Sequence, residues 1–130
     1  MKNDLNLELL KLLLQNDSNN TDNKSIELLS IDEEIIGKKC IIRTYSAGVW
    51  FGEVYKKEKN EILLKSARRL WKWWAKKSIS LSSIALYGVN YDNSKICEEN
   101  YIIWLQPIEI IPCTQEAIQN LEKAPIVESE

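Results

Sequence analysis

The chain begins with a helical pattern of leucines that gives way to a polar segment. Four leucines recur at the three- and four-residue spacing of one helical face: Leu5, Leu9, Leu12 and Leu13. Asp4 precedes them as a suitable N-cap. The next nine residues contain no apolar side chain, which is typical of a linker. The predicted organisation is an N-terminal amphipathic helix, a polar linker, a single domain and a tail, over residues 1–15, 16–24, 25–124 and 125–130.

The pattern then changes to apolar runs rich in β-branched and aromatic residues, which favours strands. Turns are predicted at Gly48 and at residues 58–60, between three such runs. They predict a β-meander. Its strands are residues 38–46, 49–57 and 61–74, and a further short strand is predicted at residues 26–32.

The last part of the chain contains both helical and strand patterns. A helix is predicted over residues 78–88, capped by Ser78 or Ser80 and ended by Gly88. A polar loop, a strand pair bent near Pro107 and a closing helix with Thr114 as N-cap follow, at residues 89–100, 101–113 and 114–123. The expected fold class is α+β, a small antiparallel sheet (a β-meander plus two further strands) with short helices on one side.

Composition narrows the classes of function. Hydrophobic residues make up 45% of the 130 residues and the net charge is -2, so the domain-wide basic surplus of many nucleic-acid binders is missing. Histidine is absent, which excludes Ser-His-Asp and Cys-His nucleophiles and imidazole-dependent zinc sites. Adjacent acidic residues show neither an acid/base pair nor metal-ligand spacing. We therefore expect no enzyme, no metal and no cofactor.

The cysteines and the apolar N-terminal run bear on location. Cys40, Cys97 and Cys113 are odd in number and far apart, which is typical of free thiols in a reducing cytosol. The run "LNLELLKLLL" contains Glu8 and Lys11 and is shorter than the ~20 apolar residues that span a bilayer. A cytoplasmic protein without a membrane segment is expected.

The stretch "SARRLWKWWAK", residues 66–76, holds three of the five tryptophans beside four cations. As a strand it would place Arg69, Trp71 and Trp73 on one face and Arg68 on the other. As a helix it would be an ordinary amphipathic element. The tryptophans could therefore belong to a core, to a subunit interface or to a ligand site, and these alternatives stay open.

The ligand alternative rests on two kinds of contact. Nucleic-acid bases stack on aromatic rings, and arginine binds phosphate through a bidentate fork. Gly52 indicates a bulge or close backbone approach, or room for a ligand ring over the sheet. The candidate ligand-binding residues are Arg43, Tyr45, Trp50, Arg68, Arg69, Trp71 and Trp73.

Three segments together resemble a family of small phage and prophage proteins: "IIRTYSAGVWFGEV" (41–54), "SARRLWKWWAKKSISLSSIALYGV" (66–89) and "IEIIPCT" (108–114). The likeness covers most of residues 38–121, and its markers are "RTYSAGV" and "ARRLW". The family resembles the sponge proteins of the Thoeris anti-defence type. The resemblance implies a small oligomeric α+β protein that sequesters cyclic ADP-ribose isomers, and in some cases cyclic oligonucleotides, made by host immune enzymes.

The expected function is therefore non-catalytic capture of a cyclic nucleotide immune signal in the host cell cytoplasm. The expected partners are that ligand and further copies of the chain, from dimer to hexamer, because an open sheet of one small chain buries a ligand poorly. Two alternatives stay open. The Trp/Arg patch could bind a host protein, or it could bind single-stranded nucleic acid, which the acidic total disfavours.

Overall fold

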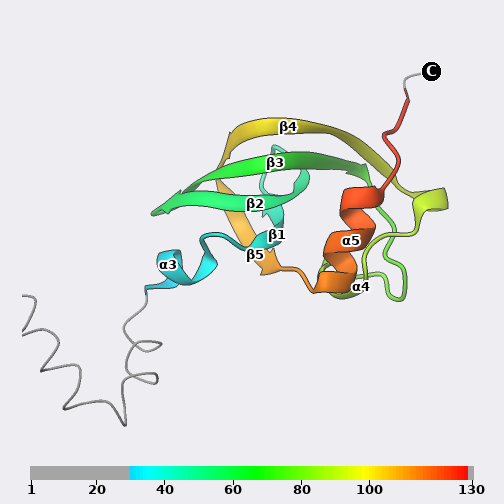
Figure 1. Ribbon diagram of the computed structural model, residues 1–130, viewed down its shortest axis with the longest axis horizontal. Coiled ribbons are helices and arrows are strands. Elements are labelled where there is room, and N and C mark those ends of the chain that lie inside the picture. Colours follow the sequence, from blue (N-terminus) through cyan, green and yellow to red (C-terminus); the bar gives the residue numbers. More distant parts are fainter. Residues whose placement is uncertain (1–29, 129–130) are drawn as a thin grey trace, which may run out of the picture. The chain divides into compact units, whose positions relative to one another are not determined.

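The computed structural model describes residues 30–128, and the helix and linker predicted for residues 1–15 and 16–24 lie outside them, as does the predicted domain start at residue 25 (Figure 1). The chain divides into two units, residues 1–34 and 35–130. No helix in the described part of the chain is long and apolar enough to cross a membrane.

The strand predicted at residues 26–32 is wrong in its described part, where helix α3 (Ile31–Ile35) begins. Ser30 Oγ accepts a hydrogen bond from the Glu33 N–H at 3.0 Å, and a Glu33 carboxylate oxygen accepts one from the Ser30 N–H at 3.4 Å. This reciprocal pair is a capping box, and its S-x-x-E signature is present in the sequence. Acidic residues in the first turn also favour a helix start over a strand.

The second unit contains one five-stranded antiparallel sheet, which confirms the predicted α+β class. The strands lie in the order β4-β3-β2-β1-β5. Their bounds are β1 Lys39–Thr44, β2 Val49–Glu58, β3 Glu61–Lys72, β4 Lys95–Leu105 and β5 Pro107–Pro112. The three-stranded meander and the bend at Pro107 are therefore confirmed.

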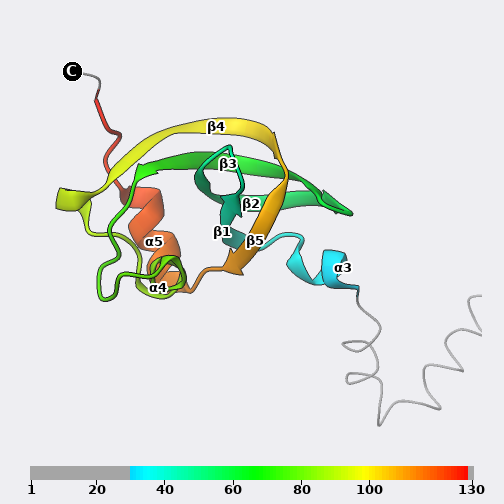
Figure 2. The ribbon, with the colours of Figure 1, turned by 180° about the vertical axis from the view of Figure 1, so that it is seen from behind.

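This sheet is strongly curled. The strands β4 and β5 lie on opposite edges, yet only Gln106 separates them in the chain. In a flat sheet, four inter-strand spacings would place those edges about 19 Å apart, far beyond the reach of one residue. The sheet must therefore roll up, and β4 turns into β5 at its end in both views (Figures 1 and 2).

Alternating side chains build a separate apolar cluster on each face of the sheet. The strand-side cluster is Cys40, Ile42, Trp50, Val54, Ile62, Leu64, Ala67 and Leu105. The helix-side cluster is Ile41, Phe51, Leu70, Ala75, Ile84, Ala85, Val89, Ile96, Leu121 and Ala124. Every strand that supplies both clusters is therefore held from two sides.

Helices α4 (Leu81–Tyr87) and α5 (Gln115–Lys123) supply the helix-side cluster, so the predicted helices and their placement on one side are confirmed. Ser80 caps α4 by accepting from the Ser83 N–H at 3.2 Å, and Thr114 caps α5 by accepting from the Ala117 N–H at 3.2 Å.

The polar loop predicted at residues 89–100 is largely wrong. A short 3-10 helix, η1 (Tyr91–Asn93), occupies its middle, and β4 already begins at Lys95. Pairing with β3 overrides the polar composition here, because an exposed edge strand needs few apolar residues. The predicted tail is also partly ordered, since the Val127 N–H donates to the Ile96 carbonyl at 2.9 Å.

The three cysteines are free thiols. Burial raises the pKa of Cys40 to about 12, with Lys38 opposing the shift. Burial and the neighbouring Cys40 raise the pKa of Cys113 to about 12 as well. The folded pKa values of both thiols lie above the unfolded value of 9.0, so the folded state favours the protonated thiols. Their contribution to stability is fully present below pH 9.0 and is lost as pH rises toward about 12.

We expect a maleimide at pH 8 to modify partly exposed Cys97 in the native protein while leaving Cys40 and Cys113 unmodified, because the thiolate is the reactive species. Peptide mass spectrometry after brief labelling, with and without denaturant, measures this. Native modification of Cys40 at the rate of Cys97 would contradict the assignment.

Candidate functional site

The Trp/Arg stretch is a strand up to Lys72, so the helix alternative is wrong. It contains two irregularities. Ser66 has a positive φ of 50°, and the register against β4 shifts on either side of Leu70. The two adjacent arginines then point to opposite faces of the sheet, as strand alternation requires. Arg68 lies on the helix side and Arg69 on the strand side.

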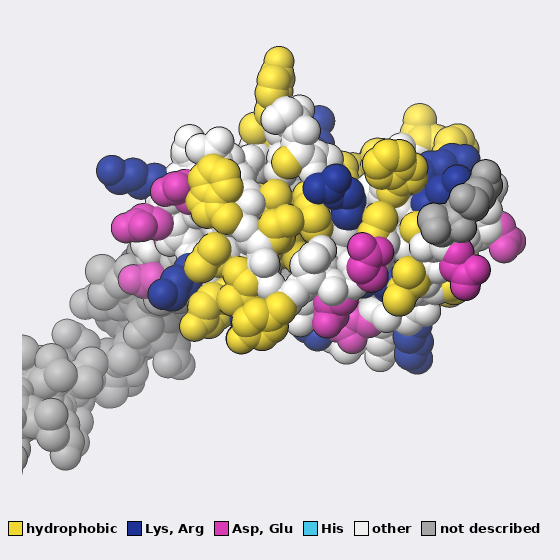
Figure 3. Space-filling model, turned by 90° about the horizontal axis from the view of Figure 1, so that it is seen from above, with side chains coloured by type: hydrophobic (Ala, Val, Ile, Leu, Met, Phe, Trp, Pro, Cys, Tyr) yellow, Lys and Arg dark blue, Asp and Glu magenta, His cyan; other side chains and the backbone are white. Residues whose placement is uncertain are grey.

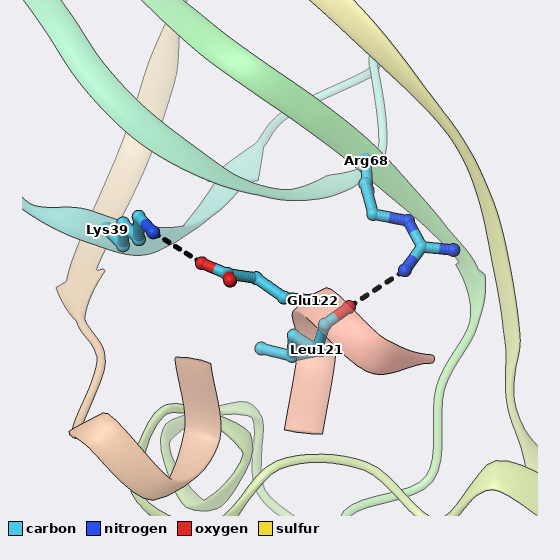
Figure 4. A network of polar contacts seen from close by, with 4 residues as sticks. All are labelled: Lys39, Arg68, Leu121 and Glu122. Atoms are coloured by element: carbon cyan, nitrogen blue, oxygen red, sulfur yellow. Dashed lines mark hydrogen bonds and ion pairs between the residues drawn. The ribbon is translucent and has the colours of Figure 1, made fainter. Parts of the chain in front are cut away.

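Arg68 is an internal anchor. Its side chain is 6% exposed. Its Nε donates to the Cys97 carbonyl at 2.8 Å. Its Nη1 donates to the Leu121 carbonyl, also at 2.8 Å (Figure 4). Leu121 is in the last turn of α5, where the helix dipole also stabilises a cation. Burial lowers the pKa of Arg68, with Glu99 as the main opposing influence. Arg68 therefore ties α5 and β4 to β3. It lies on the face opposite Arg69, as strand alternation predicted, so these two candidate ligand-binding residues do not share a site.

A cavity of about 380 Å³ lies beside Arg68, under the sheet. Across it, the ammonium of Lys39 forms an ion pair with Glu122 (Figure 4). The charged side chains that line it are Lys39, Arg68, Glu53, Glu99 and Glu122. Three carboxylates against two cations repel a phosphate, so this cavity is not a plausible nucleotide site.

The strand-side face carries a different arrangement, centred on Trp50 and Arg69. The two residues are opposite each other in β2 and β3, and the Arg69 guanidinium lies 4.5 Å from the Trp50 ring centroid. Trp50 is 2% exposed, and its indole N–H donates to the Ala47 carbonyl at 2.9 Å. The ring is thereby fixed, and it positions the guanidinium by a cation–π contact.

The Arg69 side chain has no hydrogen bond or ion pair within residues 30–128. A guanidinium that rests on an indole face keeps its N–H edge directed outward, which suits it to a phosphate or carboxylate. Trp71 follows two residues later, is 69% exposed and lies at one of the register shifts between β3 and β4. Bulges of this kind re-aim side chains and are common beside functional sites.

Tyr45 is in the turn between β1 and β2, where it is 91% exposed. Tyr45 and Ala47 line a second cavity of about 360 Å³ together with Trp104 and Ile108. Ala47 therefore connects the cavity to Trp50, whose indole it holds. We name the group Tyr45, Trp50, Arg69 and Trp71 the aromatic–arginine surface.

Two further predicted site residues, besides Arg68, lie elsewhere. Arg43 is on the opposite face of β1 from Ile42, and its Nε is 3.3 Å from a carboxylate oxygen of Glu109. Trp73 lies beyond the end of β3 and packs against the helix-side cluster. The expectation that Trp73 shares the face of Arg69 and Trp71 is wrong, because strand alternation ends with the strand at Lys72.

Sequence reasoning missed the large exposed apolar residues on the sheet, such as Tyr101, Ile102 and Trp104. Seen from above, hydrophobic side chains spread over the sheet with single cations between them (Figure 3). The Lys65 ammonium lies 4.6 Å from the Tyr55 ring centroid and 5.9 Å from that of Tyr101. The run "YIIWL" at residues 101–105 was the available signal, but its exposure depends on β4 being an edge.

Gly52 is explained without a ligand. An added Cβ would lie 2.8 Å from the Lys65 carbonyl oxygen and 2.8 Å from Leu64 Cγ. The strands β2 and β3 also shift register between Phe51 and Glu53. The structure therefore supports the close backbone approach at Gly52 over room for a ligand ring.

The core of this domain also matches a known family model. Residues 37–121 match the model described as Domain of unknown function (DUF6948). The chain belongs to this family. The DUF6948 match runs from the segment before β1 into α5, so it contains Arg68 and the whole aromatic–arginine surface. No curated protein and no solved structure matches the chain. In the described part of this DUF6948 protein, no three Cys, Asp or Glu side chains are grouped to hold a metal ion.

Proposed function

We propose that the protein is a non-catalytic binder that sequesters a small cyclic nucleotide immune signal, a cyclic ADP-ribose isomer or a cyclic oligonucleotide. It would act in the cytoplasm of the host cell during infection or prophage carriage and block anti-phage defence. The observation that carries the proposal is the Arg69 guanidinium on the Trp50 indole, which no side chain or carbonyl among residues 30–128 pairs with. Trp71, two residues further along β3, and Tyr45, in the turn after β1, are both exposed.

The chemistry of that surface supports a ligand with both a base and a phosphate. A stacked base contributes about 1–3 kcal/mol, and a charge-assisted hydrogen bond contributes about 1.5–3 kcal/mol. Capture at nanomolar concentration requires about 12 kcal/mol. One exposed tryptophan and one arginine fall short of that value, so the proposal includes further copies of the chain that cover the ligand.

We expect Arg69→Ala and Trp71→Ala each to weaken ligand binding about 10- to 100-fold, because each removes one charge-assisted or stacking contact. The probes are cyclic ADP-ribose and a cyclic dinucleotide, titrated by calorimetry and by the rise in melting temperature that a native-state ligand produces. The matched control is Arg43→Ala, which removes a surface arginine that is already paired with Glu109.

Equal losses for Arg43→Ala and Arg69→Ala would exclude the aromatic–arginine surface as the site. The ligand is then released by heat and examined by mass spectrometry. Intact ligand agrees with sequestration, whereas a cleaved ligand shows an enzyme and ends the proposal.

A second candidate function is the binding of a host protein. The many exposed hydrophobic side chains over the sheet favour it (Figure 3). Tryptophan and arginine are the residues most enriched at interface hot spots. In that case Trp71→Ala abolishes co-purification of one host protein, and neither nucleotide raises the melting temperature. Binding of single-stranded nucleic acid would instead show affinity for an oligonucleotide that falls steeply with salt.

A further inference from the structure

Among residues 30–128, one edge of the sheet is protected from pairing and most of the other is not covered by another strand. The edge strand β5 has six residues, begins and ends with proline, and has Glu109 at its centre. Proline lacks the N–H that a neighbouring strand would use, and short charged edges resist pairing. These features make β5 a poor template for another chain.

The other edge strand, β4, lacks such protection (Figures 1 and 2). It has eleven residues and no proline, and after Glu99 it has no charged residue as far as Leu105. In the described part of the chain, its outer edge is occupied at one place, where Ile126 and Val127 pair with Ile96. An uncharged edge segment with free backbone groups pairs readily with another strand.

The side chains in the second half of β4 are also largely exposed to solvent. Residues 98–102 are exposed on both faces of the strand, and Tyr101 is 76% exposed. Ile102 and Trp104 are also exposed, although β-branched and aromatic residues favour a sheet interior. This part of β4 therefore extends beyond both apolar clusters and presents an apolar edge to solvent.

We propose that the outer edge of β4 pairs with β4 of a second copy of this chain, antiparallel about a two-fold axis near Ile102. A second copy fits because such an axis brings equal, uncharged edges together and satisfies the backbone groups of both. This register places Tyr101 opposite Ile103, Asn100 opposite Trp104 and Glu99 opposite Leu105. No like charges oppose each other in it.

Other registers are disfavoured by charge and by occupancy. An axis between Glu98 and Glu99 would place these carboxylates opposite each other, which is destabilising. An axis near Ile96 would displace Val127 from the edge. The inference deepens the oligomeric part of the proposed function, but the pairing itself requires no ligand.

The first test compares the mass of the full chain with that of the variant Ile102→Glu, by sedimentation velocity without ligand. In the folded chain Ile102 is opposite Lys65 in β3, so a glutamate suits the monomer. At the two-fold axis, two glutamates would repel. We expect the mass of two chains for the unmodified protein and at least a tenfold weaker association for Ile102→Glu. The charge-matched control is Ile108→Glu on β5, which is expected to stay dimeric.

The second test is oxidative cross-linking in a Cys97→Ser background. Ile102→Cys is expected to form an interchain disulfide rapidly, because the two-fold axis places both thiols together. Ile108→Cys is expected not to. The β4 pairing would be overturned if the unmodified protein sedimented as a single chain or if Ile102→Glu stayed dimeric. Cross-linking at residue 108 equal to that at residue 102 would also overturn it. Ligand titration of Ile102→Glu is a separate readout, so a failure of nucleotide binding is distinguished from a failure of assembly.

Discussion

Replacing Arg68 by methionine is expected to destabilise the fold by about 3 kcal/mol, while the nucleotide binding proposed for the opposite face should change little. Methionine preserves much of the apolar volume but leaves the carbonyls of Cys97 and Leu121 without their donors. An unsatisfied buried acceptor costs about 1–3 kcal/mol, and the removal of a desolvated guanidinium offsets part of that loss. Arg68→Lys is expected to retain only part of the stability that Arg68→Met loses, since one ammonium lacks the fork geometry that reaches both carbonyls.

The adjacent arginine is the matched control. Arg69→Met removes a cation–π contact and no hydrogen bond, so its free energy of unfolding should fall by about 1 kcal/mol or less. Urea unfolding followed by tryptophan fluorescence measures both variants, and nucleotide titration of each completes the comparison. If the two variants lose equal stability, the anchoring role of Arg68 is wrong.

Replacing Gly88 by alanine is expected to cost about 4 kcal/mol. Gly88 ends α4 with a φ of 91°, and its N–H donates to the Ile84 carbonyl at 2.8 Å. An alanine in this backbone region is strained by about 1–3 kcal/mol. Its Cβ would also lie 2.3 Å from the Asn120 side chain.

Asn120 cannot move aside at low cost. Its Oδ1 accepts from the Val89 N–H at 2.8 Å and its Nδ2 donates to the Val89 carbonyl at 3.1 Å, so a shift breaks both hydrogen bonds. The control is Gly48→Ala, where φ is 87° but no atom lies within 4 Å of the added Cβ. It isolates backbone strain and should cost about 1–2 kcal/mol. Equal losses at both positions in thermal or urea unfolding would show that Asn120 adapts.

The local elements were predictable where short-range chemistry decides them. Caps at Ser80 and Thr114, and a turn at Gly48, identify helix starts and a hairpin because their side chains or dihedral angles act within four residues. Helix α3 was predicted as a strand, although the capping box that starts it is a short-range signal present in the sequence. The start of β4 at Lys95 could not be predicted so easily, because pairing with β3 stabilises a polar segment there.

The α+β class, the meander and the helix caps could be predicted from the residue pattern, because strand alternation and capping are local. The pattern also predicted that Arg68 and Arg69 lie on opposite faces of a strand, but not the role of either arginine. The contact of Arg68 with the last turn of α5, the position of Trp50 under Arg69 and the edge position of β4 are visible only in the folded domain. These three features join residues that are distant in the chain, and their geometry depends on how the sheet curls and on how the helices pack against it.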